Sequence, residues 1–196
     1  AVLEALRQPL EDKVITIARA SGALAFPADF MLVAAMNPCP CGNLSNPAAS
    51  CICTPGAIAR YRRRVSGPLL DRIDLHVEIG NVDVEKLVGD DADRPSESAA
   101  VRERVERARA RQRERFRGST AATNGAMTLR ELKAFCRLDA ASRGILRQAY
   151  ERFRMSVRGY YRVIKTSRTI ADLAGEATIA PEHILEALQY RPRVEA

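Results

Sequence analysis

The sequence feature that most constrains this chain is a group of four cysteines within fifteen residues. They form the pattern C-x-C-x9-C-x-C, made by Cys39, Cys41, Cys51 and Cys53. The segment that holds them, residues 37–56 (NPCPCGNLSNPAASCICTPG), is rich in Pro, Asn, Ser and Gly. Its largest apolar side chains are Leu44 and Ile52, so burial alone cannot organise it, and small irregular segments of this kind need a staple.

Alternate residues of an extended chain point to the same side, so each C-x-C pair can present two sulfurs to one ion. Four sulfurs complete the tetrahedral shell of zinc and leave no open position for catalysis. The pattern therefore predicts a structural zinc site, with free or redox-active thiols as the alternative. The remaining cysteine, Cys136 in LKAFCRL, is expected to be a buried helix residue.

The length of the apolar segments indicates whether the chain can enter a membrane or be secreted. The longest apolar run, FMLVAAM, is far too short to span a bilayer, and the first residues show no signal-peptide pattern. We therefore expect a cytoplasmic protein with no membrane partner. In a reducing compartment, clustered cysteines favour metal binding over disulfides.

The charge of the chain is strongly basic, with a formal net charge of +7. The excess is concentrated in residues 101–117 (VRERVERARARQRERFR), which hold eight arginines and three glutamates. A polyanionic partner such as DNA is one interpretation. The other is an ordinary solvated face of a helix.

The first part of the chain has the pattern of an α/β region. Residues 1–12 suit an amphipathic helix with no cap before it, so we expect a fragment of a longer protein. Two β-rich runs around Ser21-Gly22 predict a hairpin over residues 14–28. The run 30–36 predicts a central parallel strand, and the alternation in residues 73–79 (IDLHVEI) predicts a strand near a sheet edge.

The second part of the chain has the pattern of a helical bundle. The polar segment from residue 89 is the expected boundary, with a linker over 89–100 between an α/β region at 1–88 and helices at 101–196. Helix boundaries are predicted from local signals. These are the N-cap Thr54 before Pro55, the capping box Thr128 and Glu131, the cap Asp139, the stop Gly175 and the first-turn Pro181.

Three stretches carry a family resemblance: FMLVAAMNPCPCG, CTPGAIARYRRRVSGPLLDRIDLHVEI, and SVRGYYRVIKTSRTIADLAG with PEHILEALQYR. They resemble the magnesium-chelatase-like AAA+ ATPases of the competence protein ComM type, over nearly the whole chain and least from Gly80 to Gly125. The resemblance implies the second half of an AAA+ P-loop ATPase core, with a β-hairpin insert and a cysteine zinc loop, followed by a helical lid. No G-x-x-x-x-G-K-[ST] phosphate loop and no Asp-Glu strand occur in the sequence, so the chain should not hydrolyse ATP alone.

The resemblance assigns roles around ATP. Asn37 matches sensor 1, a polar residue at the tip of a central strand that orients the attacking water. Arg72 in LLDRID matches the arginine finger, which reaches the ATP of a neighbouring subunit. Without the resemblance, Asn37 would be a turn residue. Arg72 would likewise be a surface ion pair with Asp71 or Asp74.

Two further roles follow from the same resemblance. Arg158 in SVRGYYR matches sensor 2, an arginine early in a lid helix, with Arg162 and Arg168 as competing candidates. The hairpin matches one that touches nucleic acid in the pore of related rings, where Lys13 and Arg19 would contact phosphates. The hairpin tip has no aromatic residue for base stacking, and an ordinary solvated hairpin is the alternative.

Three functions remain open at this point. The first is a ring-forming, hexameric ATPase that uses ATP and magnesium as a DNA motor, a helicase or branch-migration enzyme in recombination or transformation. The second is the ATPase subunit of a magnesium-chelatase-like metal-insertion complex. The third is a non-enzymatic, zinc-stabilised nucleic-acid-binding module.

Overall fold

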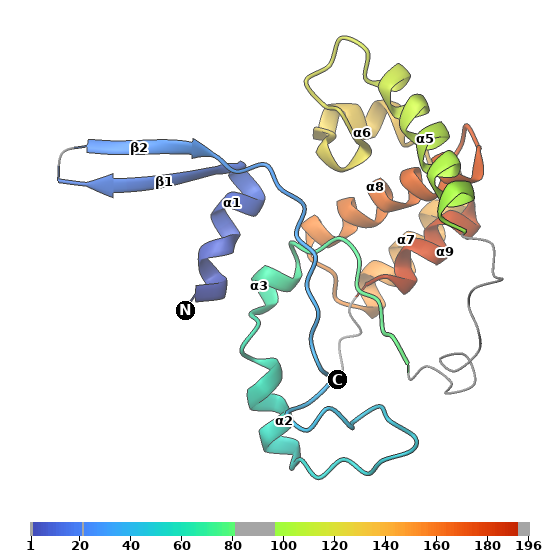
Figure 1. Ribbon diagram of the computed structural model, residues 1–196. Helices are drawn as coiled ribbons and strands as arrows, with labels where there is room; N and C mark the ends of the chain where they lie inside the picture. The colour runs from blue at the N-terminus through green and yellow to red at the C-terminus, as the bar shows by residue number, and fades with distance from the viewer. Residues whose placement is uncertain (1, 21, 81–96, 192–196) are drawn as a thin grey trace. The chain divides into compact units, whose positions relative to one another are not determined.

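The computed structural model describes residues 2–20, 22–80 and 97–191 (Figure 1). These residues form two compact units. In the described residues, the first unit comprises 2–73 and 77–80, and the second comprises 74–76 and 97–191. We describe each unit by itself.

The first unit begins with two short helical segments and a β-hairpin. The 3-10 segment η1 (Val2–Leu6) leads into α1 (Arg7–Asp12), which ends at Lys13 in a left-handed conformation. Strands β1 (Val14–Arg19) and β2 (Gly22–Pro27) pair antiparallel, with Val14 opposite Pro27 and Arg19 opposite Gly22. The predicted hairpin over residues 14–28 is therefore confirmed.

Two short helices follow the cysteine segment. Helix α2 (Pro55–Arg62) begins after Thr54, whose side chain accepts a hydrogen bond from the backbone N–H of Ala57. Helix α3 (Gly67–Leu70) begins after Ser66, which caps the N–H of Leu69 in the same way. Both helices carry proline in the first turn, where its missing N–H costs nothing. The predicted start of α2 is therefore confirmed, whereas α3 was not predicted.

Two predicted strands are absent from the described structure. Residues 30–36 lie outside any helix or strand, and Met31 and Val33 are 87% and 85% exposed. Residues 73–79 are likewise not a strand. A strand requires a partner with a free hydrogen-bonding edge, and among the described residues β1 and β2 pair only with each other. Predicting a central strand and an edge strand was therefore wrong for this chain by itself.

The second unit is a bundle of helices (Figure 1). Its elements are α5 (Ser98–Arg115), η3 (Asn124–Ala126), α6 (Leu129–Phe135), α7 (Ala140–Arg152), α8 (Val157–Ala174) and α9 (Pro181–Gln189). The capping box, the Asp139 cap, the Gly175 stop and the first-turn Pro181 are all confirmed. The arginine-rich helix begins at Ser98, inside the expected linker, and residues 89–96 of that linker lie outside the described residues.

The core of this bundle is apolar and well covered. Leu146, Val163 and Ile184 are at most 1% exposed and belong to one cluster with residues of α6, α7, α8 and α9. Cys136 is buried in this cluster, as predicted, but it is the C-cap residue that follows α6 and not a residue within the helix. Burial raises the pKa of its thiol to about 11.

A buried polar network ties α5 to α8. Arg115 forms a bidentate ion pair with Asp172, at 2.5 and 2.6 Å, and Asn124 donates to the same carboxylate at 2.8 Å. Arg168, 1% exposed, contacts Asp172 at 3.0 Å and donates to the carbonyls of Glu176 and Ala177. These bonds fix the loop that follows α8 onto the helix.

Membrane insertion by a helix finds no support in the described part of the chain, where no helix combines the length and the apolar character that a bilayer requires.

Candidate metal centre and nucleotide-sensing residues

The structure brings the four predicted cysteines together. Their sulfur atoms all lie within 4.8 Å of one another. The sulfur of Cys39 is 3.4 Å from that of Cys41 and 3.7 Å from that of Cys51, and the last two are 3.6 Å apart. All are free thiols, with separations well beyond a disulfide bond.

These separations match a tetrahedral metal. Four sulfurs bound about 2.3 Å from one ion would stand about 3.8 Å from each other. Cys39 is completely buried and the other three are half-buried, so the sulfurs face inward. The four cysteines could therefore hold a metal ion, and the set of four thiols suits zinc.

Local turns produce this arrangement. The backbone N–H of Gly42 donates to the carbonyl of Cys39 at 3.1 Å, and Gly42 has φ +81°, which favours glycine. A second turn is closed by the N–H of Asn46, which donates to the carbonyl of Asn43. Cys53 directly precedes the Thr54 cap of α2, so the second pair of cysteines is anchored to a helix start.

The pKa values of the thiols reflect how close the sulfurs lie to one another. Backbone N–H groups of Asn43 and Ile52 lower the pKa of Cys41 to about 6. The N–H of Cys41 lowers the pKa of Cys53, but partial burial and the adjacent sulfurs outweigh it and raise that pKa to about 12. Four adjacent thiolates repel one another, and a bound divalent cation would offset that repulsion.

Asn37 lies two residues before Cys39 and is exposed. The run before it is not a strand in this chain, so the strand tip expected for sensor 1 is not formed here. Only Pro38 separates Asn37 from Cys39, so a fixed conformation of the cysteines would also restrict the backbone of Asn37. The role of Asn37 toward ATP stays a prediction.

Arg72 lies just after α3 and is held within the first unit. It forms an ion pair with Glu11 of α1 and donates to the carbonyl of Pro68 at 2.7 Å. Its side chain is only 9% exposed. The expected alternative was an ion pair with Asp71 or Asp74, whereas Asp74 pairs with Arg162. Sequence reasoning missed Glu11, because 61 positions separate it from Arg72 and no local pattern joins them.

The three candidates for sensor 2 differ in burial. Arg158 is exposed in the first turn of α8, which begins after the Ser156 cap. Arg162 is mostly covered and bound to Asp74, and Arg168 is enclosed by the polar network described above. Exposure at a helix start leaves Arg158 the best placed to reach a ligand.

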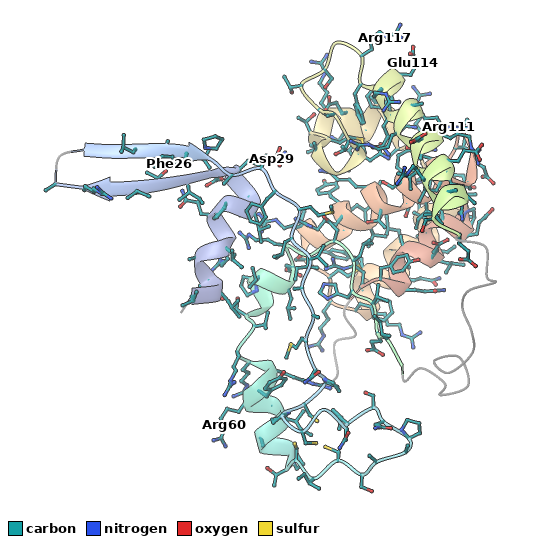
Figure 2. The ribbon with its side chains drawn as sticks, in the orientation of Figure 1. Phe26, Asp29, Arg60, Arg111, Glu114 and Arg117 are labelled. Atoms are coloured by element: carbon teal, nitrogen blue, oxygen red, sulfur yellow. The ribbon has the colours of Figure 1, made fainter. Side chains whose placement is uncertain are left out.

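The two basic residues predicted for the hairpin are not alike. Lys13, at the base, forms an ion pair with Asp29 at 2.8 Å, and Figure 2 shows Asp29 beside that base. Arg19 is exposed at the tip end of β1. The hairpin does carry an aromatic residue, Phe26, which is 47% exposed but lies opposite Ile15, away from the tip. Arg19 is therefore the stronger candidate for a phosphate contact.

Comparison with known proteins assigns the family. Residues 1–87 match the family model described as magnesium chelatase, subunit ChlI, and residues 95–191 match the model described as its C-terminal part. The chain belongs to the magnesium chelatase family. It is 42% identical to Competence protein ComM of Haemophilus influenzae, over 98% of this chain and 36% of that protein.

Other relatives are similar over the same extent. An uncharacterized protein of Mycobacterium tuberculosis is 37% identical over 97% of this chain, and the protein YifB of Escherichia coli is 36% identical over 96%. The chain spans 36% to 37% of the length of these three relatives. The resemblance drawn from the sequence motifs is thereby confirmed.

Proposed function

We propose that this chain is the sensor and lid part of a ring-forming AAA+ ATPase that works as a DNA motor. The observation that carries the proposal is the 42% identity to a competence protein, which extends over 98% of the chain. The basic charge of +7 and the exposed Arg19 on the hairpin favour a polyanionic substrate.

In this proposal the residues divide the work on ATP. Asn37 orients the attacking water, Arg72 offsets charge on the phosphoryl group of a neighbouring subunit, and Arg158 couples the lid to the nucleotide. A zinc ion on the four cysteines holds the segment that begins at Asn37 in one conformation. Because the chain lacks a phosphate loop, the triphosphate and its magnesium are held by parts of the longer protein that it does not include.

The ion pair of Arg72 adds a step to this mechanism. Its guanidinium is already bound to Glu11 in this structure. To act on a neighbouring subunit it must exchange that carboxylate for a phosphate. Carboxylate and phosphate groups both offer oxygen atoms that can accept two hydrogen bonds from one guanidinium. The exchange therefore needs little change in the geometry of the Arg72 N–H donors. Glu11 therefore holds the finger back until a nucleotide is present.

A second function, metal insertion into a porphyrin, is favoured by the description of the matching family models. A third is nucleic-acid binding without catalysis. ATP turnover by the longer protein, measured with and without DNA, separates them. DNA-stimulated turnover supports the motor. Turnover that responds only to a porphyrin-binding partner supports metal insertion, and the absence of turnover supports simple binding.

The sharpest test of the shared site is Arg72→Ala in the longer protein. We expect turnover to fall by on the order of 10³-fold if the whole finger effect is lost. Nucleotide binding should change little, because a finger acts on the neighbouring site. Glu11→Gln is the matched control: it removes the same ion pair but keeps the finger, so turnover should persist.

Mixing provides the decisive outcome. Arg72→Ala protein is combined with a second inactive variant that lacks its phosphate-loop lysine. Some sites in the mixed ring then pair an intact phosphate loop with an intact Arg72, and part of the activity should return. If subunits are shown to exchange and no activity returns, Arg72 does not act across an interface.

A further inference from the structure

One side of helix α5 carries a line of three arginines, Arg102, Arg109 and Arg113, which we call the arginine flank. At 100° per residue these positions fall within about 40° of each other, beside the buried stripe that contains Ala108 and Gln112. Arg113 lies eleven residues after Arg102, which is about 16 Å along the helix axis. All three side chains are exposed.

Most other arginines between residues 101 and 117 contact another part of the protein. Arg107 pairs with Glu103, Arg117 with Glu114, and Arg115 with the buried Asp172. Arg111, labelled in Figure 2, lies against Gly175 at the C-terminal end of α8, where the helix dipole favours a cation.

The arginine flank has no such partner. No hydrogen bond or ion pair within the described residues involves Arg102, Arg109 or Arg113. Arg104 is also unpaired there, but it lies on the opposite side of the helix, the side it shares with Arg111. One acidic residue, Glu106, lies on the same side between Arg102 and Arg109, so the flank keeps a net charge of about +2.

One part of the flank is repulsive. Arg109 and Arg113 are one turn apart, and like charges at that spacing repel, whereas Glu106 offsets the charge only toward Arg102 and Arg109. Burial offers little compensation, because every described side chain from residue 98 to 107 is exposed. A bound anion that follows the helix would remove the repulsion.

We propose that the arginine flank binds the phosphodiester backbone of a nucleic acid, as a second contact surface in addition to the hairpin. A line of charge about 16 Å long suits a polyanion with regularly spaced charges better than a single carboxylate. Guanidinium groups bind phosphate oxygens in a bidentate manner. No aromatic side chain lies among the three arginines, so the contact should position DNA without reading its sequence. The inference rests on the proposed function and deepens it.

The test measures binding of this chain to a fluorescently labelled 30-base-pair DNA over a range of salt concentrations. The variant Arg102→Gln/Arg109→Gln/Arg113→Gln removes the flank but keeps residues that favour helix. The control variant Arg130→Gln/Arg137→Gln/Arg143→Gln removes the same charge from exposed arginines elsewhere in the second unit. Circular dichroism confirms that both retain their helices.

We expect the slope of log affinity against log salt to fall by about 2 to 3 units in the flank variant. It should fall by less than about half a unit in the control. Equal losses in the two variants would mean that only net charge matters, and would overturn the proposal. So would an unchanged slope in the flank variant, or no DNA binding by the unmodified chain.

Two further arms separate the possible failures. If Lys13→Gln/Arg19→Gln lowers the slope while the flank variant does not, the flank proposal fails and a DNA substrate stands. The second arm adds polyglutamate as a competitor of the DNA. If the flank variant loses binding to polyglutamate but keeps binding to DNA, the partner of the flank is an acidic protein and the proposal fails. The motor function is judged independently, by the ATP turnover of the longer protein.

Discussion

The two units of the chain are stabilised in different ways. The second unit encloses its own core, where Leu146, Val163 and Ile184 are fully buried. In the described part of the first unit, only Pro9, Cys39 and Leu69 are buried, while large apolar side chains such as Val33 remain exposed. The comparison shows that a helical bundle can complete itself within this chain, whereas the first unit depends on hairpin bonds, helix caps and its cysteines.

The physical reason is the range over which backbone hydrogen bonds are made. A helix satisfies its N–H and C=O groups within a few residues, so α7, α8 and α9 need neighbours only for their apolar faces. A strand in a sheet must take its partners from elsewhere in the chain. The run 30–36 has the composition of a buried strand but finds no partner strand in the described residues.

The largest expected effect is metal removal, which should affect the first unit alone. Zinc binding in small cysteine sites contributes about 10 kcal/mol or more to folding, and the segment 37–56 has little else to order it. We expect one zinc per chain by elemental analysis of reduced protein. A strong chelator, or Cys51→Ser, should then increase hydrogen exchange throughout 37–56 and leave the thermal unfolding of the helical unit unchanged.

Cys136→Ser is the matched control for this experiment, because Cys136 is distant from the cluster in sequence and is buried in the other unit. It should leave the zinc content unchanged and lower the stability of the bundle. Less than about a tenth of an equivalent of zinc in the unmodified chain, with 37–56 still protected from exchange, would contradict the metal site.

The second effect in size should be confined to the helical unit. Asp172→Asn leaves Arg115 and Arg168 buried without their carboxylate, which should destabilise the bundle by about 3 to 5 kcal/mol. Asp139→Asn is the matched control, since asparagine is an equally good N-cap and the change should be nearly neutral. Thermal unfolding followed by circular dichroism measures both. A loss below about 1 kcal/mol for Asp172→Asn would contradict the role of the network.

The same network predicts a dependence on pH. Burial raises the pKa of Asp172, but hydrogen bonds from Arg115 and Asn124 outweigh it and hold the pKa below its ordinary value of 3.8. A carboxyl group with a lowered pKa stabilises the fold above its ordinary pKa, and that stabilisation is lost as the pH falls through the native value. The bundle should therefore lose stability below about pH 4, and Asp172→Asn should flatten that loss.

Sequence patterns predicted the local features of both units well. The Thr128 and Glu131 capping box, the Asp139 cap and the Gly175 stop need only neighbouring residues, and each appears where it was expected. The clustering of the cysteines was also predictable, because short spacings and turns bring the sulfurs together. Each of these features is encoded within about a dozen residues.

Long-range pairings could not be predicted in the same way. The contact of Arg72 with Glu11, and that of Arg115 with Asp172, join residues 61 and 57 positions apart. The local sequence pattern does not indicate which carboxylate will pair with a given arginine. The pairing depends on how whole helices and loops pack against each other. The two missing strands have the same origin, since their apolar pattern specifies burial but not the partner that provides it.

The smallest expected effect concerns Val33, and it tests the comparison most directly. Val163→Ala should destabilise the bundle by about 2 kcal/mol, because it removes two buried methyl groups and leaves a cavity. The identical change at Val33, which is 85% exposed, should alter the stability of this chain by less than about 0.5 kcal/mol.

In the longer protein that we propose, the outcome should differ. If the run 30–36 becomes a central strand when further strands are present, Val33 is buried there and Val33→Ala should also cost about 2 kcal/mol. Denaturant unfolding of both forms gives the two values. A cost near zero in both would show that the run remains exposed in the longer protein, and that its apolar composition serves something other than a sheet. A cost near 2 kcal/mol in this chain alone would mean that the first unit does have a core.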